Sequence, residues 1–91
     1  MNTQQFSSVW DAIEAQDAEN LRLRSRLMMA LTEHITAVGW TQNDAAVRLG
    51  VTQPRISDLV RGKINLFSLD ALVNMATAAG LRVDITIDHA A

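Results

Sequence analysis

Three polar side chains, Gln53, Arg55 and Ser57, lie close together in the middle of the chain and have the chemistry needed to read nucleic-acid bases. An arginine side chain offers two donors that match O6 and N7 of guanine, and a glutamine can donate to and accept from adenine. We expect these three residues to contact bases in double-stranded DNA. Residues that contact bases specify a sequence, so a second set is needed to bind the phosphates.

Candidate phosphate contacts flank the same stretch of sequence. We expect Thr41, Thr52, Arg61 and Lys63 to contact the DNA backbone. The whole chain of 91 residues carries a net charge of −2, which by itself argues against a nucleic-acid partner. The charge is unevenly distributed, however: residues 1–20 and 64–91 are acidic, and residues 21–63 carry a net +4. A basic centre between acidic ends is compatible with local phosphate contact.

Other kinds of chemistry find little support. The chain has no cysteine, which excludes disulfides, thiolate nucleophiles and cysteine-ligated metals. Its two histidines, His34 and His89, are far apart, and no paired carboxylates or glycine-rich phosphate loop occur. We therefore expect no enzymatic activity, no bound metal and no cofactor. The absence of a signal sequence or an 18-residue apolar run predicts a cytoplasmic protein. Its length of 91 residues predicts a single domain over residues 1–91.

The candidate DNA contacts lie on a predicted helix-turn-helix over about residues 41–63, which reads TQNDAAVRLGVTQPRISDLVRGK. Thr41 and Thr52 are typical N-caps, and Pro54 is tolerated in a first helical turn. Gly50 supplies the turn between the two short helices. The small and apolar side chains are expected to pack the pair together and against a core; they are Ala45, Ala46, Val51, Ile56 and Leu59.

The flanking sequence predicts three further helices. Ser8 and Asp11 indicate a short helix over about 8–15, and an apolar stripe from Leu21 to Val38 indicates a long helix that ends at Gly39. Another helix is expected from Ser68 to Gly80. The predicted fold is therefore mainly α, a repressor-like domain of five helices with one C-terminal β-strand.

The C-terminal segment changes period. Leu81, Val83, Ile85 and Ile87 alternate with polar residues, which is typical of a half-buried strand over about 81–88. A single strand leaves backbone groups unpaired, so we expect it to pair with the same strand of a second chain and to make these four residues a dimer contact. Two alternatives remain: the segment packs on the helices as an extended tail, or it pairs with N-terminal residues.

The quoted motif resembles the DNA-binding domains of the phage-repressor type (Cro/CI, or XRE), and in particular small HigA-like antitoxin regulators. The flanking segments AENLRLRSRLMMALTEHI and FSLDALVNMATAAGLRVDITI are similar to the same subgroup, so the resemblance covers about residues 18–87. It implies a homodimeric, sequence-specific repressor in which Gln42 contacts a DNA phosphate and Gln53, Arg55 and Ser57 face bases. It also implies that the protein acts as the antitoxin of a toxin–antitoxin operon and binds a small ribonuclease toxin.

Two residues depart from the wider repressor family. Pro54 and Asp58 stand where many relatives have amides, and an acidic side chain repels phosphate unless it accepts from cytosine N4. The target sequence therefore stays open. The alternative function is a protein–protein adaptor that does not bind DNA, in which the helix pair only packs and the basic residues are ordinary surface.

Overall fold

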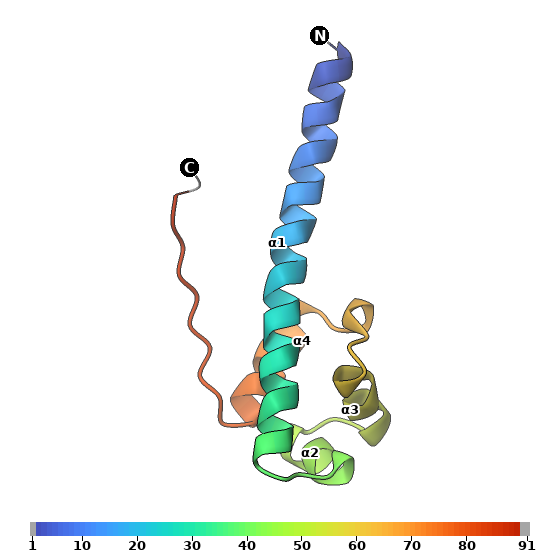
Figure 1. Cartoon of the computed structure of the whole chain (residues 1–91), viewed down its shortest axis with the longest axis vertical. Coiled ribbons are helices and arrows are strands. Elements are labelled where there is room, and N and C mark those ends of the chain that lie inside the picture. Colours follow the sequence, from blue (N-terminus) through green and yellow to red (C-terminus); the bar gives the residue numbers. More distant parts are fainter. Residues whose placement is uncertain (1, 90–91) are drawn as a thin grey trace.

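The computed structural model describes the backbone of residues 2–89 and the side chains of residues 17–89. This part of the chain is mainly α, as predicted, but it contains four α-helices instead of five (Figure 1). They are α1 (Asn2–Ala37), α2 (Gln42–Leu49), α3 (Gln53–Val60) and α4 (Leu69–Ala78), with a 3-10 turn, η1 (Ile64–Leu66), between α3 and α4. The shorter helices gather around the C-terminal half of α1, and the N-terminal half of α1 projects beyond them.

The missing fifth helix is explained by α1. Instead of a short helix over 8–15 and a separate long one, a single helix of 36 residues runs without a break. Residues 15–20 contain neither glycine nor proline, so nothing in this stretch stops a helix that has already formed. The helix ends as expected: Gly39 has a φ of 74°, and the Trp40 N–H donates to the Ile35 carbonyl at 3.1 Å. The side chains of the predicted start, Ser8 and Asp11, lie outside the described residues.

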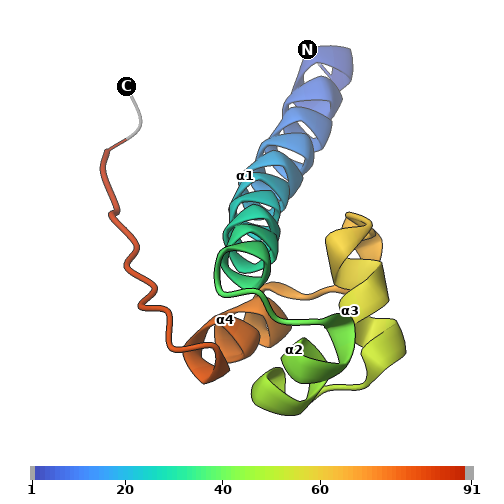
Figure 2. The same ribbon diagram turned by 60° about the horizontal axis from the view of Figure 1, so that its bottom comes forward.

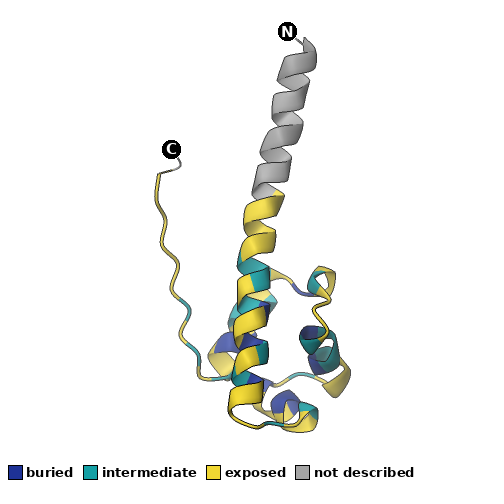
Figure 3. Ribbon diagram, in the orientation of Figure 1, coloured by how far each residue is buried: buried dark blue, intermediate teal, exposed yellow. Residues whose placement is uncertain are grey.

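One apolar core joins the elements. Its fully buried large side chains come from α1, α3, the connection after α3 and α4, and they are Leu31, Ile56, Leu59, Phe67 and Leu72. Helix α2 contributes Ala45, Ala46 and Leu49. Figure 3 shows the buried positions on the sides of α1, α2, α3 and α4 that face one another. Full burial of such a side chain stabilises a fold by roughly 1.5–3 kcal/mol. The core therefore fixes α2 and α3 firmly against α1 and α4, whereas Leu21 and Val38, at the two ends of the predicted stripe, are exposed.

The predicted C-terminal strand is absent. Residues 81–89 leave α4 as an extended tail that forms no strand with any described part of the chain, and Figures 1 and 2 show this tail beside α1. Strand structure needs a partner for its backbone ladder, and a single copy of this chain supplies none among its described residues. The tail is anchored at its start, where Leu81 and Val83 pack against the core, while Ile85 and Ile87 are 57% and 89% exposed.

Candidate nucleic-acid interface

The helix-turn-helix begins at two threonine caps. Thr41 Oγ1 accepts from the Asp44 N–H at 3.0 Å, and Asp44 Oδ2 accepts from the Thr41 N–H at 3.0 Å, which completes a capping box. This backbone donor, followed by the Thr41 hydroxyl and then the charge of Arg48, lowers the pKa of Asp44 below its ordinary value. At the second helix, Thr52 Oγ1 accepts from the Arg55 N–H at 3.3 Å. Both predicted caps are confirmed.

The turn between α2 and α3 has the predicted form. Gly50 adopts a left-handed conformation with a φ of 70°, and the Val51 N–H donates to the Ala46 carbonyl at 3.0 Å. Ala45 is fully buried, which allows α2 to lie close to its neighbours, and Ile56 fixes the inner face of α3 in the core. The geometry leaves the N-terminal ends of α2 and α3 at the surface.

At this surface the structure joins two predicted DNA contacts. Gln53 Nε2 donates to Gln42 Oε1 at 2.7 Å, so the first residue of α3 is hydrogen-bonded to the first residue of α2. Gln53 is exposed and Gln42 is half-buried. Both residues were predicted to contact DNA, but the hydrogen bond between them could not be predicted, because they are eleven positions apart in the sequence. The bond restricts the rotamers available to Gln53 and so orients its amide.

Arg55, one of the predicted base contacts, is directed at the protein in this structure. Its side chain is half-buried and its guanidinium lies over the Phe67 ring, with Cζ 4.0 Å from the ring centroid. Its Nη1 also donates to the carbonyl of Leu66. Ser57 and Asp58 are half-buried as well, so Gln53 and Pro54 are the only residues of α3 that are fully exposed.

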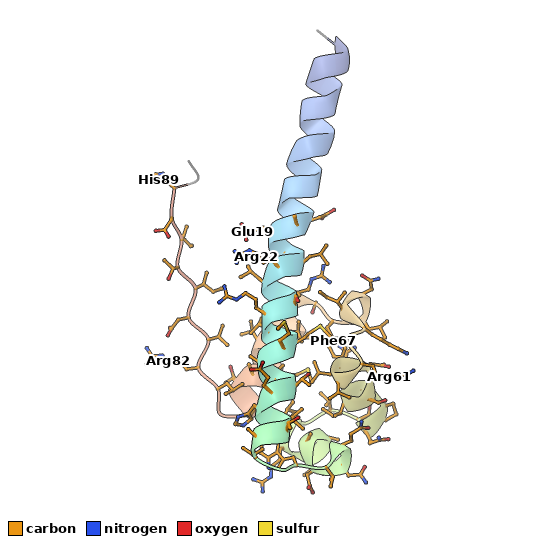
Figure 4. The ribbon with its side chains drawn as sticks, in the orientation of Figure 1. Glu19, Arg22, Arg61, Phe67, Arg82 and His89 are labelled. Atoms are coloured by element: carbon orange, nitrogen blue, oxygen red, sulfur yellow. The ribbon has the colours of Figure 1, made fainter. Side chains whose placement is uncertain are left out.

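The cations after α3 form the basic edge of this surface. Arg61 is exposed and points away from the body of the protein, as Figure 4 shows. Lys63 Nζ lies 3.5 Å from Asp58 Oδ1, so the carboxylate that departs from the family pattern has a cation of the same chain beside it. Arg48, on α2, stacks over the Trp40 ring at 5.5 Å. Positive charge therefore lies after the C-terminal end of α3, at Arg61 and Lys63, and on α2, at Arg48.

Other site types are not apparent in the described part of the chain. No three histidine, aspartate or glutamate side chains gather as a metal site there, and His34 packs edge-on against Trp40 with centroids 5.4 Å apart. No described helix combines the length and apolar character needed to cross a membrane.

Comparison with known proteins decides the family. A family profile described as a helix-turn-helix domain matches residues 9–88. The chain belongs to this helix-turn-helix family. A solved structure described as an XRE-family transcriptional regulator is 35% identical, with a TM-score of 0.75 over 81% of this chain and 83% of that chain. No curated protein matches the chain.

Family membership agrees with the geometry. The matched range covers both capped helices, the Gly50 turn and the packing helices around them, which together form a helix-turn-helix DNA-binding domain. The chain is thus grouped with helix-turn-helix transcriptional regulators and not with enzymes. The predicted resemblance to XRE regulators is confirmed at this level.

Proposed function

We propose that the protein is a sequence-specific transcriptional repressor that binds double-stranded DNA as a homodimer and acts in the cytoplasm. The observation that carries this proposal is the surface at the start of α2 and α3, where Gln42 and Gln53 are hydrogen-bonded, together with the exposed cations Arg61 and Lys63 that follow the other end of α3. In a helix-turn-helix the N-terminal part of the second helix enters the major groove. Here that helix is α3.

The proposed contacts divide into two groups. Gln53 and Ser57 contact base edges, and Arg55 joins them only if its guanidinium leaves the Phe67 ring. The DNA backbone is contacted from the caps and from the end of α3, by Thr41, Gln42, Thr52, Arg61 and Lys63. The division follows from position, because residues on the first turns of α3 reach into the groove and residues beyond it reach only phosphate.

Binding of selected and scrambled duplexes, measured by fluorescence anisotropy, tests this function. With about six phosphate contacts per dimer, the slope of log affinity against log salt is expected to be about −5. Gln53→Ala is expected to weaken the selected duplex by about 1–3 kcal/mol per half-site and the scrambled duplex much less. A slope near zero for the wild-type protein would refute DNA binding and favour the adaptor function.

The tail supports the homodimer. Its backbone edge is open, and its apolar side chains, Leu81, Val83, Ile85 and Ile87, extend from the core into solvent. We propose that two tails pair as antiparallel strands. To enter major grooves on one face of the duplex, the two α3 helices of such a dimer must lie about 34 Å apart, or a multiple of this distance.

Proline substitution tests the pairing. Val83→Pro removes a backbone donor from the centre of the proposed ladder and is expected to increase the monomer fraction in sedimentation. His89→Pro, outside the alternating segment, is the matched control and is expected to leave the dimer intact. An unchanged dimer in folded Val83→Pro would contradict strand pairing.

A narrower proposal, supported by the resemblance to HigA-like regulators, is that the protein is the antitoxin of a small ribonuclease toxin. Co-expression with the product of the adjacent gene tests it. A stable complex and relief of growth arrest are expected. A neighbouring gene whose product neither arrests growth nor binds the protein would leave a solitary repressor as the function.

A further inference from the structure

The segment that connects α3 to α4 receives two arginine side chains from different helices. Arg55 comes from α3 and Arg24 from α1, and together they donate to three carbonyl groups of this segment, those of Ile64, Leu66 and Phe67. The Ile64 carbonyl also accepts from the Phe67 N–H at 3.2 Å. A guanidinium has five donors in a fixed plane, so one arginine can donate to more than one carbonyl of this turn. The connection is therefore bonded to both α1 and α3.

The Arg55 contact combines two interactions. Its guanidinium carbon lies 4.0 Å from the Phe67 ring centroid, well inside the range of about 6 Å over which a cation is attracted to a ring face. Phe67 is only 1% exposed, so the ring itself is fixed in the core. The hydrogen bond from Arg55 Nη1 to the Leu66 carbonyl fixes the orientation of the guanidinium group over the ring. The charged end of Arg55 is thus directed at the protein.

Arg24, on α1, is bonded to the same segment. Its Nη1 donates to the carbonyls of Ile64 and Phe67 at 3.2 and 3.3 Å, and its Nε donates to Asn20 Oδ1 at 2.6 Å. The two arginines reach Phe67 through different groups, Arg55 through the ring and Arg24 through the carbonyl. A chain of contacts consequently runs from α1 through the connection to the third residue of α3.

From this arrangement we infer that Arg55 is a positioning residue that fixes the orientation of α3 through Phe67 and Leu66, and that it does not read a base. The inference rests on the proposed DNA-binding function. One guanidinium cannot stack on Phe67, donate to Leu66 and also present its paired donors to O6 and N7 of guanine. With Arg55 in this role, Gln53 and Ser57 carry the base contacts, on a helix whose orientation is maintained by the two arginines.

Nuclear magnetic resonance of the free protein tests the contact without DNA. The Arg55 Nε–Hε signal is expected to be displaced by the ring current of Phe67, relative to that of Arg26, an exposed arginine on α1. Phe67→Leu keeps an apolar side chain in the core and should remove the displacement. An Arg55 signal at the position of the Arg26 signal in the wild-type protein would overturn the inference.

The same signal, observed with a saturating selected duplex, separates positioning from base reading. A positioning Arg55 keeps its ring-current displacement in the complex. A base-reading Arg55 loses it, because its guanidinium must move from Phe67 to the groove, and that outcome would overturn the inference.

Affinity measurements give an independent readout. Arg55→Lys and Phe67→Leu are each expected to weaken the selected duplex about threefold to tenfold while keeping the preferred base at every operator position. The double variant should bind the selected duplex only slightly more weakly than the single variant with the lower affinity, because both substitutions remove the same Arg55–Phe67 interaction. Arg22→Lys is the matched control for the change of side chain and should bind as the wild type does.

A changed base preference in Arg55→Lys alone would overturn the inference. The proposed function is tested separately. If the wild-type protein binds no duplex selectively, the proposed DNA-binding function is refuted, but the Arg55 signal of the free protein still shows whether Arg55 holds α3 against Phe67.

Discussion

Replacing Gly50 with alanine tests whether the turn between α2 and α3 depends on backbone conformation alone. Gly50 has a φ of 70° and closes α2, with its N–H directed at the Val47 carbonyl at 3.3 Å. A Cβ built at this position meets no atom within 4 Å. The substitution therefore adds no steric clash, and its whole cost comes from holding an L-residue in the left-handed region.

The expected loss of stability can be worked out from the backbone conformation alone. A left-handed residue with a Cβ costs roughly 1–2 kcal/mol, so Gly50→Ala should lower the free energy of unfolding by about this amount. In a domain of this size, each kcal/mol lowers Tm by about 4–8 °C. Gly50→Asn is the matched control, because asparagine also carries a Cβ but tolerates the left-handed region better, and its loss should be smaller.

Urea and thermal unfolding of the three proteins measure these losses. A loss above about 3 kcal/mol for Gly50→Ala would mean that the added methyl group meets tightly packed atoms, which would refute the open space around the turn. Equal losses for alanine and asparagine would refute the backbone origin of the effect.

Three further substitutions test the caps and the basic edge. Thr52→Ala removes the cap of α3 and is expected to cost about 1 kcal/mol in urea unfolding; no loss would contradict its role. The folded-state pKa of Asp44 is lowered, so the stability that its carboxylate contributes is complete above about pH 4 and is lost as the pH falls through the lowered pKa. Asp44→Asn should therefore be less stable than the wild type at pH 7 and approach wild-type stability at low pH. Lys63→Ala should weaken selected and scrambled duplexes equally and reduce the salt slope by about one per contact, as measured by anisotropy; an unchanged slope would argue against a phosphate contact.

Features that depend on neighbouring residues could be predicted from the sequence. The caps at Thr41, Thr52 and Ser68 form in the structure because a side-chain oxygen and a backbone donor three positions later suffice. The turn at Gly50 is local in the same way. These signals located the helix-turn-helix and its exposed end within a residue or two.

Features that depend on distant parts of the chain could not be predicted. Nothing near Arg55 in sequence shows that Phe67 will lie beneath its guanidinium, and the Gln42–Gln53 bond needs the two helix starts to meet in space. The continuity of α1 was missed because a cap signal at Ser8 does not end a helix that begins earlier. The strand was predicted from alternation alone, but a strand also needs a partner for its backbone groups, and no described part of the chain supplies one.

The tail and α3 lie on opposite sides of α1 (Figures 1 and 2), so a rotation at the proposed dimer contact would displace α3 across the width of the fold. The axis along which they are separated in Figure 1 measures 27 Å. A rotation of about 10° where the tails pair, acting over about this distance, would move α3 by about 5 Å, more than the 3.4 Å step between base pairs. A small change of angle at the dimer contact would thus be enough to take the two α3 helices out of register with their half-sites.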